Sequence, residues 1–99
     1  MNLEEIKLYN LQLKEIARKY GINKVFIFGS VARGESSKQS DIDFLVEMQD
    51  GASMLGVGGF SYEVEQLLGI FVDVIPTSVL SELSDRDFAE RVQVEAVAI

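Results

Sequence analysis

Apolar residues recur at spacings of three and four along the first twenty positions, and polar residues fill the positions between them. This period predicts one amphipathic helix over residues 3–20. Its apolar face would contain Ile6, Tyr9, Leu13, Ile16, Ala17 and Tyr20. Asn2 and Glu5 have the spacing of a capping box at the start of this helix, and Gly21 is a natural terminator at its end.

Three short runs rich in β-branched and aromatic residues predict buried strands. These runs are residues 24–28 (KVFIF), 41–47 (DIDFLVE) and 70–75 (IFVDVI). The dipeptide Gly29-Ser30 interrupts the first run, and Pro76 closes the third because proline cannot donate to a sheet ladder. The sequence therefore predicts a small sheet built on these runs.

The segments between the strands are polar or rich in glycine. Residues 31–35 (VARGE) predict a helical turn that Gly34 ends, and residues 35–40 (ESSKQS) predict a polar loop. Residues 48–60 contain four of the eight glycines of the chain, which predicts a second loop. Either loop can close over a ligand or serve only as a connection, and the sequence leaves both readings open.

Two further helices are expected in the second half of the chain. Residues 61–68 predict a short helix that Gly69 stops, and residues 78–91 predict a longer one whose later part Ser84 can cap. The pattern of the last eight residues fits either a helix end or a short strand. This order of elements predicts an α+β fold, a small mixed β-sheet covered by helices, as a single domain over residues 1–99.

The composition is that of an ordinary globular domain. The chain has 99 residues, of which 47% are hydrophobic and 25% charged, and this is enough for one hydrophobic core. No apolar run reaches the roughly 18 residues that span a membrane. The first residues also lack the basic and apolar regions of a signal peptide. We therefore expect a cytoplasmic protein that does not associate with membranes.

Two missing residue types narrow the possible chemistry. The chain has no cysteine and no histidine, which excludes thiolate and disulfide chemistry and removes the usual general base. Catalysis would therefore use carboxylates, hydroxyls, Lys or Arg, backbone amides, or a metal bound by oxygen. The formal net charge of −7 argues against direct binding of nucleic acid and favours a basic protein partner.

Two aspartates at the start of the second predicted strand form a candidate metal site. Side chains two positions apart on a strand share a face, so Asp41 and Asp43 would point the same way while Ile42 enters the core. Their mutual repulsion would favour a bound cation, and Mg²⁺ takes a few carboxylates together with waters and phosphates. The Asp-x-Asp motif alone is weak, because on its own it more often marks only an exposed strand start.

A third aspartate stands in the otherwise apolar third strand. A buried carboxylate without a partner is costly, so Asp73 is expected to have one. It can line the same cleft as the first two aspartates, either as a metal ligand or as the general base for an acceptor hydroxyl. The alternative is a structural Asp73 that is satisfied by backbone amides, Arg86 or Arg91.

The dipeptide after the first strand is a candidate phosphate-binding turn. Glycine permits close approach of the backbone to a phosphate, so Gly29 would admit the ligand. The amide and hydroxyl of Ser30 would donate to the phosphate at the start of a helix. Arg33 lies one turn further on and can reach a phosphate or stay in solvent. An ordinary strand-ending turn has the same residues.

The spacing of these features resembles the signature of the polymerase-β-like nucleotidyltransferase superfamily. That signature is Gly-Ser, ten residues and Asp-x-Asp, and in the run GSVARGESSKQSDID ten residues separate Ser30 from Asp41. The superfamily also has a third carboxylate on a later strand, which Asp73 matches. In size the chain resembles the minimal nucleotidyltransferases, the MNT proteins.

The resemblance implies a fold, a reaction and a partner. MNT proteins have the polymerase-β-like nucleotidyltransferase fold and serve as antitoxins of HEPN toxins, which are helical RNases. They transfer AMP from ATP to a tyrosine of the HEPN partner. By this resemblance Gly29 and Ser30 bind the triphosphate. Asp41 and Asp43 hold Mg²⁺, and Asp73 completes the acid triad. The expected assembly is a hetero-oligomer with a HEPN-type toxin.

Two other functions stay open at this stage. A non-catalytic antitoxin would neutralise its partner by occupancy, with a nucleotide site that is vestigial or regulatory. A nucleotidyltransferase acting on a small molecule would need an acceptor site from another subunit. Substitution of Asp41 and Asp43 separates the first alternative from catalysis, because inhibition by occupancy would survive the change.

Overall fold

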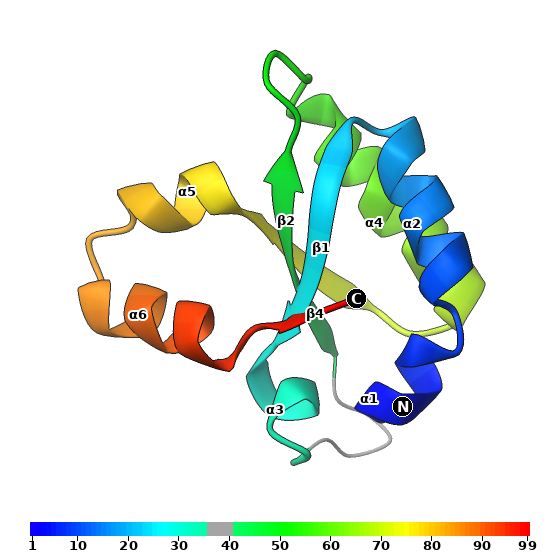
Figure 1. The fold of residues 1–99 in the computed structure, drawn as a ribbon, viewed down its shortest axis with the longest axis horizontal. Helices are drawn as coiled ribbons and strands as arrows, with labels where there is room; N and C mark the ends of the chain where they lie inside the picture. The colour runs from blue at the N-terminus through cyan, green and yellow to red at the C-terminus, as the bar shows by residue number, and fades with distance from the viewer. Residues whose placement is uncertain (36–40) are drawn as a thin grey trace.

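A four-stranded mixed sheet runs through the centre of the protein, and helices cover both of its faces (Figure 1). The computed structural model describes residues 1–35 and 41–99. The strands are β1 (Ile22–Phe28), β2 (Ile42–Met48), β3 (Val72–Pro76) and β4 (Val97–Ala98). Their order is β3-β2-β1-β4; β2 and β3 are parallel, and the other neighbours are antiparallel. The predicted α+β fold with a small mixed sheet is confirmed.

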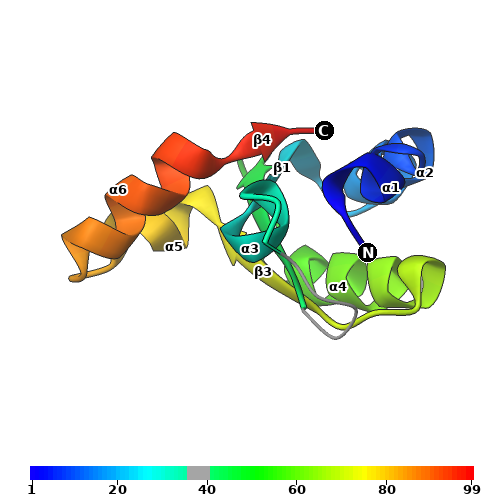
Figure 2. The same cartoon turned by 90° about the horizontal axis from the view of Figure 1, so that it is seen from below.

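The helices separate into two groups on opposite sides of the sheet (Figure 2). One group comprises α1 (Leu3–Lys7), α2 (Asn10–Lys19) and α4 (Leu55–Leu68). The other comprises α5 (Thr77–Glu82) and α6 (Arg86–Glu95), while the short α3 (Gly29–Ala32) directly follows β1. In the described ranges, no helix is long and apolar enough to cross a membrane.

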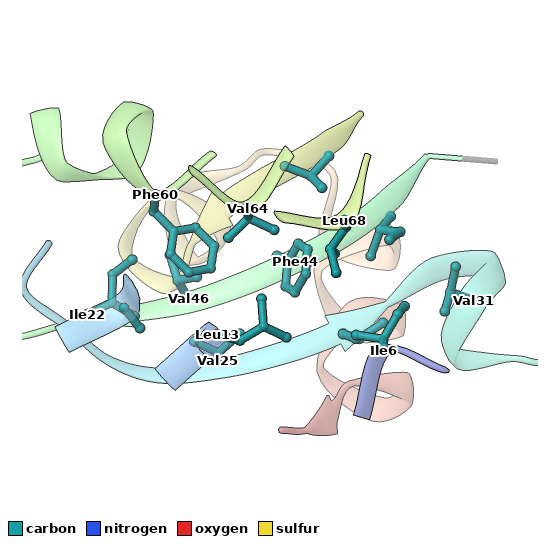
Figure 3. Packing of buried hydrophobic residues seen from close by; sticks show 14 residues of the cluster. Ile6, Leu13, Ile22, Val25, Val31, Phe44, Val46, Phe60, Val64 and Leu68 are labelled. Carbon is teal, nitrogen blue, oxygen red and sulfur yellow. The ribbon is translucent and has the colours of Figure 1, made fainter. Parts of the chain in front are cut away.

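Alternation along the strands divides the core into two unequal parts. The larger part lies under α2 and α4, where the rings of Phe44 and Phe60 meet edge to face with centroids 5.8 Å apart (Figure 3). The smaller part lies under α5 and α6 and contains Phe28, Leu45, Leu80, Ala89 and Val92. Ile42 and Phe44 enter the larger core, as the strand pattern predicts.

The strand predictions are correct to within one or two residues, but the predicted N-terminal helix is divided. The chain leaves the helix at Leu8 and Tyr9, where the main-chain bonds join residues three apart instead of four. The predicted capping box is present: the Glu5 amide donates to Asn2 Oδ1 at 2.8 Å, and the Asn2 amide donates to Glu5 Oε1 at 3.0 Å. Gly21 follows α2 with a φ of 73°.

The prediction of a loop over residues 48–60 is wrong for its second half, because α4 begins at Leu55. Two glycines of this helix lie directly against Tyr20, the residue that caps the end of α2. A Cβ on Gly56 would overlap the carbonyl oxygen of Tyr20, and one on Gly59 would overlap its ring. These glycines therefore serve close helix packing, a use that their local sequence does not distinguish from a loop.

The C-terminal helix prediction is also divided in the structure. The chain from 78 to 91 contains parts of α5 and α6, and the cap of α6 is Asp85 instead of Ser84. The Asp85 carboxylate accepts from the Phe88 amide at 3.1 Å. The last residues adopt both predicted conformations, since α6 continues to Glu95 and β4 follows it. The predicted turn begins earlier, at Gly29, and residues 36–40 of the polar loop lie outside the described residues.

Candidate active site

Two of the predicted acidic residues lie side by side on the central sheet. Asp43 of β2 and Asp73 of β3 are direct partners in the parallel ladder, so their side chains leave the same face of the sheet. On the other side of β2, Phe28 of β1 pairs with Asp43. Gly29, the residue after Phe28, therefore lies next to Asp43. The fold thus brings the Gly-Ser turn and the acidic residues together.

These residues line one open cleft between the sheet and α6. Its volume is about 620 Å³. Gly29, Ser30, Arg33, Asp43 and Asp73 all contribute to its lining. The rest of the lining consists of Phe28, Val74, Ile75, Phe88, Arg91, Val92 and Glu95. The cleft thus combines an acidic end with an apolar wall, an arrangement common in ligand sites.

The acidic end of the cleft is electrostatically unfavourable without a cation. Partial burial raises the pKa of Asp43 above its ordinary value of 3.8, and repulsion from Asp73 and Asp41 raises it further. Arg33 acts in the opposite direction and lowers the same pKa. A cation beside Asp43 and Asp73 would relieve this repulsion, which is the behaviour expected of a metal site.

Asp73 differs from its predicted environment. It is exposed at the second position of β3, so the expectation of a buried carboxylate in mid-strand is wrong. The reason is that β3 lies at the edge of the sheet and the cleft leaves this face open. Arg86 donates to two main-chain carbonyl oxygens at 3.0 Å, and Arg91 lies over the Phe88 ring. These contacts give the arginines other roles than holding Asp73.

Asp41 lies just before β2 and is exposed, close enough to Asp43 for its charge to raise the pKa of that carboxyl. Among the described residues, no group of three or more acidic side chains is gathered closely enough to hold a metal ion. The donor set still fits Mg²⁺, which commonly takes one or two protein carboxylates and completes its shell with water and phosphate oxygens. Asp43 and Asp73 would be the protein carboxylates of such a site.

The structure explains why glycine precedes Ser30. Gly29 has a φ of 76°, which is left-handed, and a Cβ at this position would overlap the carboxylate of Asp43. Ser30 is half-buried and lines the cleft. The helix that starts here has only four residues, so local amides and the hydroxyl matter more than a helix dipole.

One residue of the site has no counterpart in the sequence prediction. Glu95, at the end of α6, accepts from the Gly29 amide at 3.0 Å and from Arg33 Nη1 at 2.9 Å. Arg33 Nε also donates to Glu35 at 2.7 Å. The sequence offers only a weak sign of this role: Glu95 is a charged residue at a position, three after the buried Val92, that falls on the inward face of the helix.

Comparison with known proteins decides the family. The sequence profile of the nucleotidyltransferase domain matches residues 10–98, nearly the whole chain. The chain belongs to the nucleotidyltransferase family. This nucleotidyltransferase is 42% identical over 95 residues to a candidate protein adenylyltransferase of Methanocaldococcus jannaschii, covering 95% of this chain and 99% of the relative. It is also 35% identical to the protein adenylyltransferase MntA of Thermococcus cleftensis over 81% of this chain and 82% of that protein.

Solved structures agree with this assignment. A structure described as a candidate minimal nucleotidyltransferase superposes with a TM-score of 0.81 at 32% identity, covering 100% of this nucleotidyltransferase and 97% of that chain. A toxin–antitoxin crystal structure with AMP-PNP superposes with a TM-score of 0.68 at 19% identity, covering 89% of this chain and 69% of that one. At this identity the second comparison supports the fold alone. The resemblance to minimal nucleotidyltransferases is confirmed.

Proposed function

We propose that this nucleotidyltransferase transfers AMP from ATP to a tyrosine hydroxyl of a HEPN-type RNase toxin and thereby acts as its antitoxin. The observation that carries the proposal is the direct pairing of Asp43 with Asp73 beside the Gly29-Ser30 turn. This pairing supports the proposal because it would give one end of a single cleft both metal-binding carboxylates and phosphate-binding groups. Nucleotidyl transfer needs both, because charge develops around the α-phosphate during the reaction.

Mg²⁺ is the cofactor that the donor set suits. Asp43 and Asp73 would hold it, and Asp41 lies close enough to add to the negative field felt by Asp43. When bound, Mg²⁺ would neutralise triphosphate oxygens and favour departure of pyrophosphate. The Ser30 amide and hydroxyl would donate to the same triphosphate at the cleft wall.

A carboxylate of the chain can also accept the proton of the tyrosine hydroxyl. In the proposed reaction the tyrosine oxygen attacks the α-phosphorus of ATP, and the bond from that phosphorus to the bridging oxygen breaks. Pyrophosphate leaves with the bond electrons, and the hydroxyl proton passes to the Asp73 carboxylate. Asp73 suits this role because it is exposed to the cleft, where an acceptor can reach it.

The identity of the acceptor rests on the relatives. The Methanocaldococcus relative, which this chain covers by 99%, is named a candidate protein adenylyltransferase. The Thermococcus relative, which it covers by 82%, is named a protein adenylyltransferase. Structures with the same fold are described as toxin–antitoxin complexes, including one of a tri-AMPylated HEPN toxin with an MNT antitoxin. The formal charge of −7 also suits a basic protein partner.

The test uses ATP labelled on either the α- or the γ-phosphate. Purified protein, Mg²⁺ and a lysate of the source cells are incubated with each label, and the labelled macromolecules are separated. We expect the α-label alone to appear on one small protein. The Asp43→Asn variant should lose the signal, whereas Asp50→Asn, in the exposed turn after β2, should retain it. Label from the γ-phosphate would mean phosphoryl transfer and contradict the proposal.

A second outcome would favour neutralisation by occupancy. In that case neither label would transfer, the partner would still co-purify with the protein, and the Asp43→Asn variant would inhibit the toxin as well as the unmodified protein does. Catalytic neutralisation predicts the opposite, since the variant would bind its partner and leave its RNase activity intact.

A further inference from the structure

Glu95 joins the two ends of the α3 turn through both of its carboxylate oxygens. Oε1 accepts from the Gly29 amide at 3.0 Å, and Oε2 accepts from Arg33 Nη1 at 2.9 Å. The Glu95 side chain is only 17% exposed, so its bond to the Gly29 amide is partly shielded from water, whereas the Arg33 side chain is 45% exposed. Hydrogen bonds to a charged group in such a place are the stronger kind.

The position of Glu95 is itself fixed from two sides. On its N-terminal side, Val92 is buried in the smaller core. On its C-terminal side, β4 pairs with β1, and Val97 lies opposite Ile27. Since Glu95 stands between these two anchors, its carboxylate has a defined place relative to the strand that leads into Gly29.

The turn that Glu95 holds has little helical stability of its own, although Val31 anchors its middle in the larger core. The α3 helix has four residues, and Gly29 adopts the left-handed conformation without a Cβ to restrict it. A short helix with a glycine at its start is expected to sample other conformations unless tertiary contacts hold it. The two hydrogen bonds of Glu95, to Gly29 and to Arg33, supply such contacts at both ends of the turn; together they are called the Glu95 tie.

We propose that Glu95 is a positioning residue for the phosphate-binding turn, an inference that rests on the proposed function. By taking the Gly29 amide, Glu95 fixes the peptide that leads into Ser30 and leaves the Ser30 amide and hydroxyl for the triphosphate. Arg33 then acts mainly through this tie, since its Nε and Nη1 already donate to Glu35 and Glu95. This role differs from the direct phosphate contact that its place in the sequence suggests.

The experiment measures binding of a non-hydrolysable ATP analogue with Mg²⁺ by calorimetry, so it does not depend on transfer. We expect Glu95→Ala to weaken binding by at least about tenfold. Glu95→Gln keeps an acceptor for the Gly29 amide and should weaken binding less. Glu90→Gln, an exposed change on the same helix, should bind as the unmodified protein does.

The Gly29 amide provides a second readout in the same proteins. Its proton resonance in a nitrogen-15 correlation spectrum reports the hydrogen bond to Glu95 directly. We expect this resonance to move most in Glu95→Ala and less in Glu95→Gln, in the same order as the loss of affinity. If Glu95→Ala fails to fold, Glu95→Gln still supplies both measurements.

Two results would overturn the inference. Unchanged affinity in a folded Glu95 variant with a displaced Gly29 resonance would show that the tie is only structural. Tighter binding would show that the carboxylate competes with the phosphates. A protein that binds the analogue with the predicted order of affinities but transfers no AMP to any acceptor would instead contradict the proposed function and leave the positioning role standing.

Discussion

Asp43 and Phe44 are consecutive residues of β2, yet they lie in opposite environments. Phe44 is fully buried and packs against Phe60 under α4. Asp43 is only half-buried, stands beside Asp73 and has a pKa raised by burial and repulsion. At this point of the strand one side chain stabilises the fold and the next one costs stability, although Leu45, on the same face as Asp43, is buried in the smaller core. Alternation lets seven residues of one strand serve both purposes.

The largest effect on stability is expected from a substitution of the buried Phe44. Phe44→Ala is expected to lower the free energy of unfolding by about 3–5 kcal/mol, because it removes a fully buried ring and leaves a cavity. Denaturant unfolding measures the loss. Leu55→Ala, at a side chain that is 88% exposed, should change it by less than about 0.5 kcal/mol. A loss for Phe44→Ala as small as this control would contradict the assigned packing.

The turn beside Asp43 contains two glycines. Comparing them separates the cost of a left-handed backbone from the cost of crowding Asp43. Gly29 and Gly34 have almost the same left-handed φ, 76° and 75°, but among the described residues a Cβ would meet a neighbour at Gly29 and none at Gly34. Gly34→Ala should cost about 1–2 kcal/mol from backbone strain and retain nucleotide binding. Gly29→Ala should cost more and lose binding. Equal stability and equal binding in both variants would contradict the close approach to Asp43.

The Asp43 carboxyl should make the stability of the protein depend on pH. The pKa of Asp43 is raised above 3.8 in the folded protein, so the folded state binds this proton more tightly than the unfolded chain does. The resulting stabilisation is present below about pH 3.8 and is lost as the pH rises through the raised pKa. Asp43→Asn removes this loss.

Thermal melts from about pH 4 to about pH 7 would measure the effect. The Asp43→Asn variant should gain melting temperature relative to the unmodified protein as the pH rises, and the gain should level off once Asp43 is fully ionised. Carboxylates that do not interact with Asp43 cancel in the difference, whereas its repulsion by Asp73, Asp41 and Glu95 is part of the measured effect. A difference that does not change with pH would show that Asp43 is not destabilised by its charge.

Much of this comparison could be predicted from the sequence, because strand alternation and motif spacing are local. The spacing of Asp41, Asp43 and Phe44 is enough to place charge and core on opposite faces. The placement of Asp73 beside Asp43 also agreed with expectation, although its exposure did not. Exposure depended on the edge position of β3, which no local pattern records.

The features that the sequence did not show all depend on distant contacts. Gly56 and Gly59 look like loop residues until Tyr20 is placed against them. Glu95 looks like an ordinary helix-end acid until β4 brings it back to Gly29, 66 positions away. Tertiary packing decided these roles, and helix and turn propensities were overridden.

In the proposed function, Asp43 and Asp73 carry nucleotidyl transfer at the expense of stability. The most direct test measures the rate of AMP transfer and the melting temperature on one preparation of the Asp73→Asn variant. We predict a rate lowered by about a hundredfold or more, because both a ligand and a proton acceptor are lost, together with a melting temperature equal to or above that of the unmodified protein. A transfer rate within a few-fold of the unmodified protein's, in a folded variant, would contradict the account.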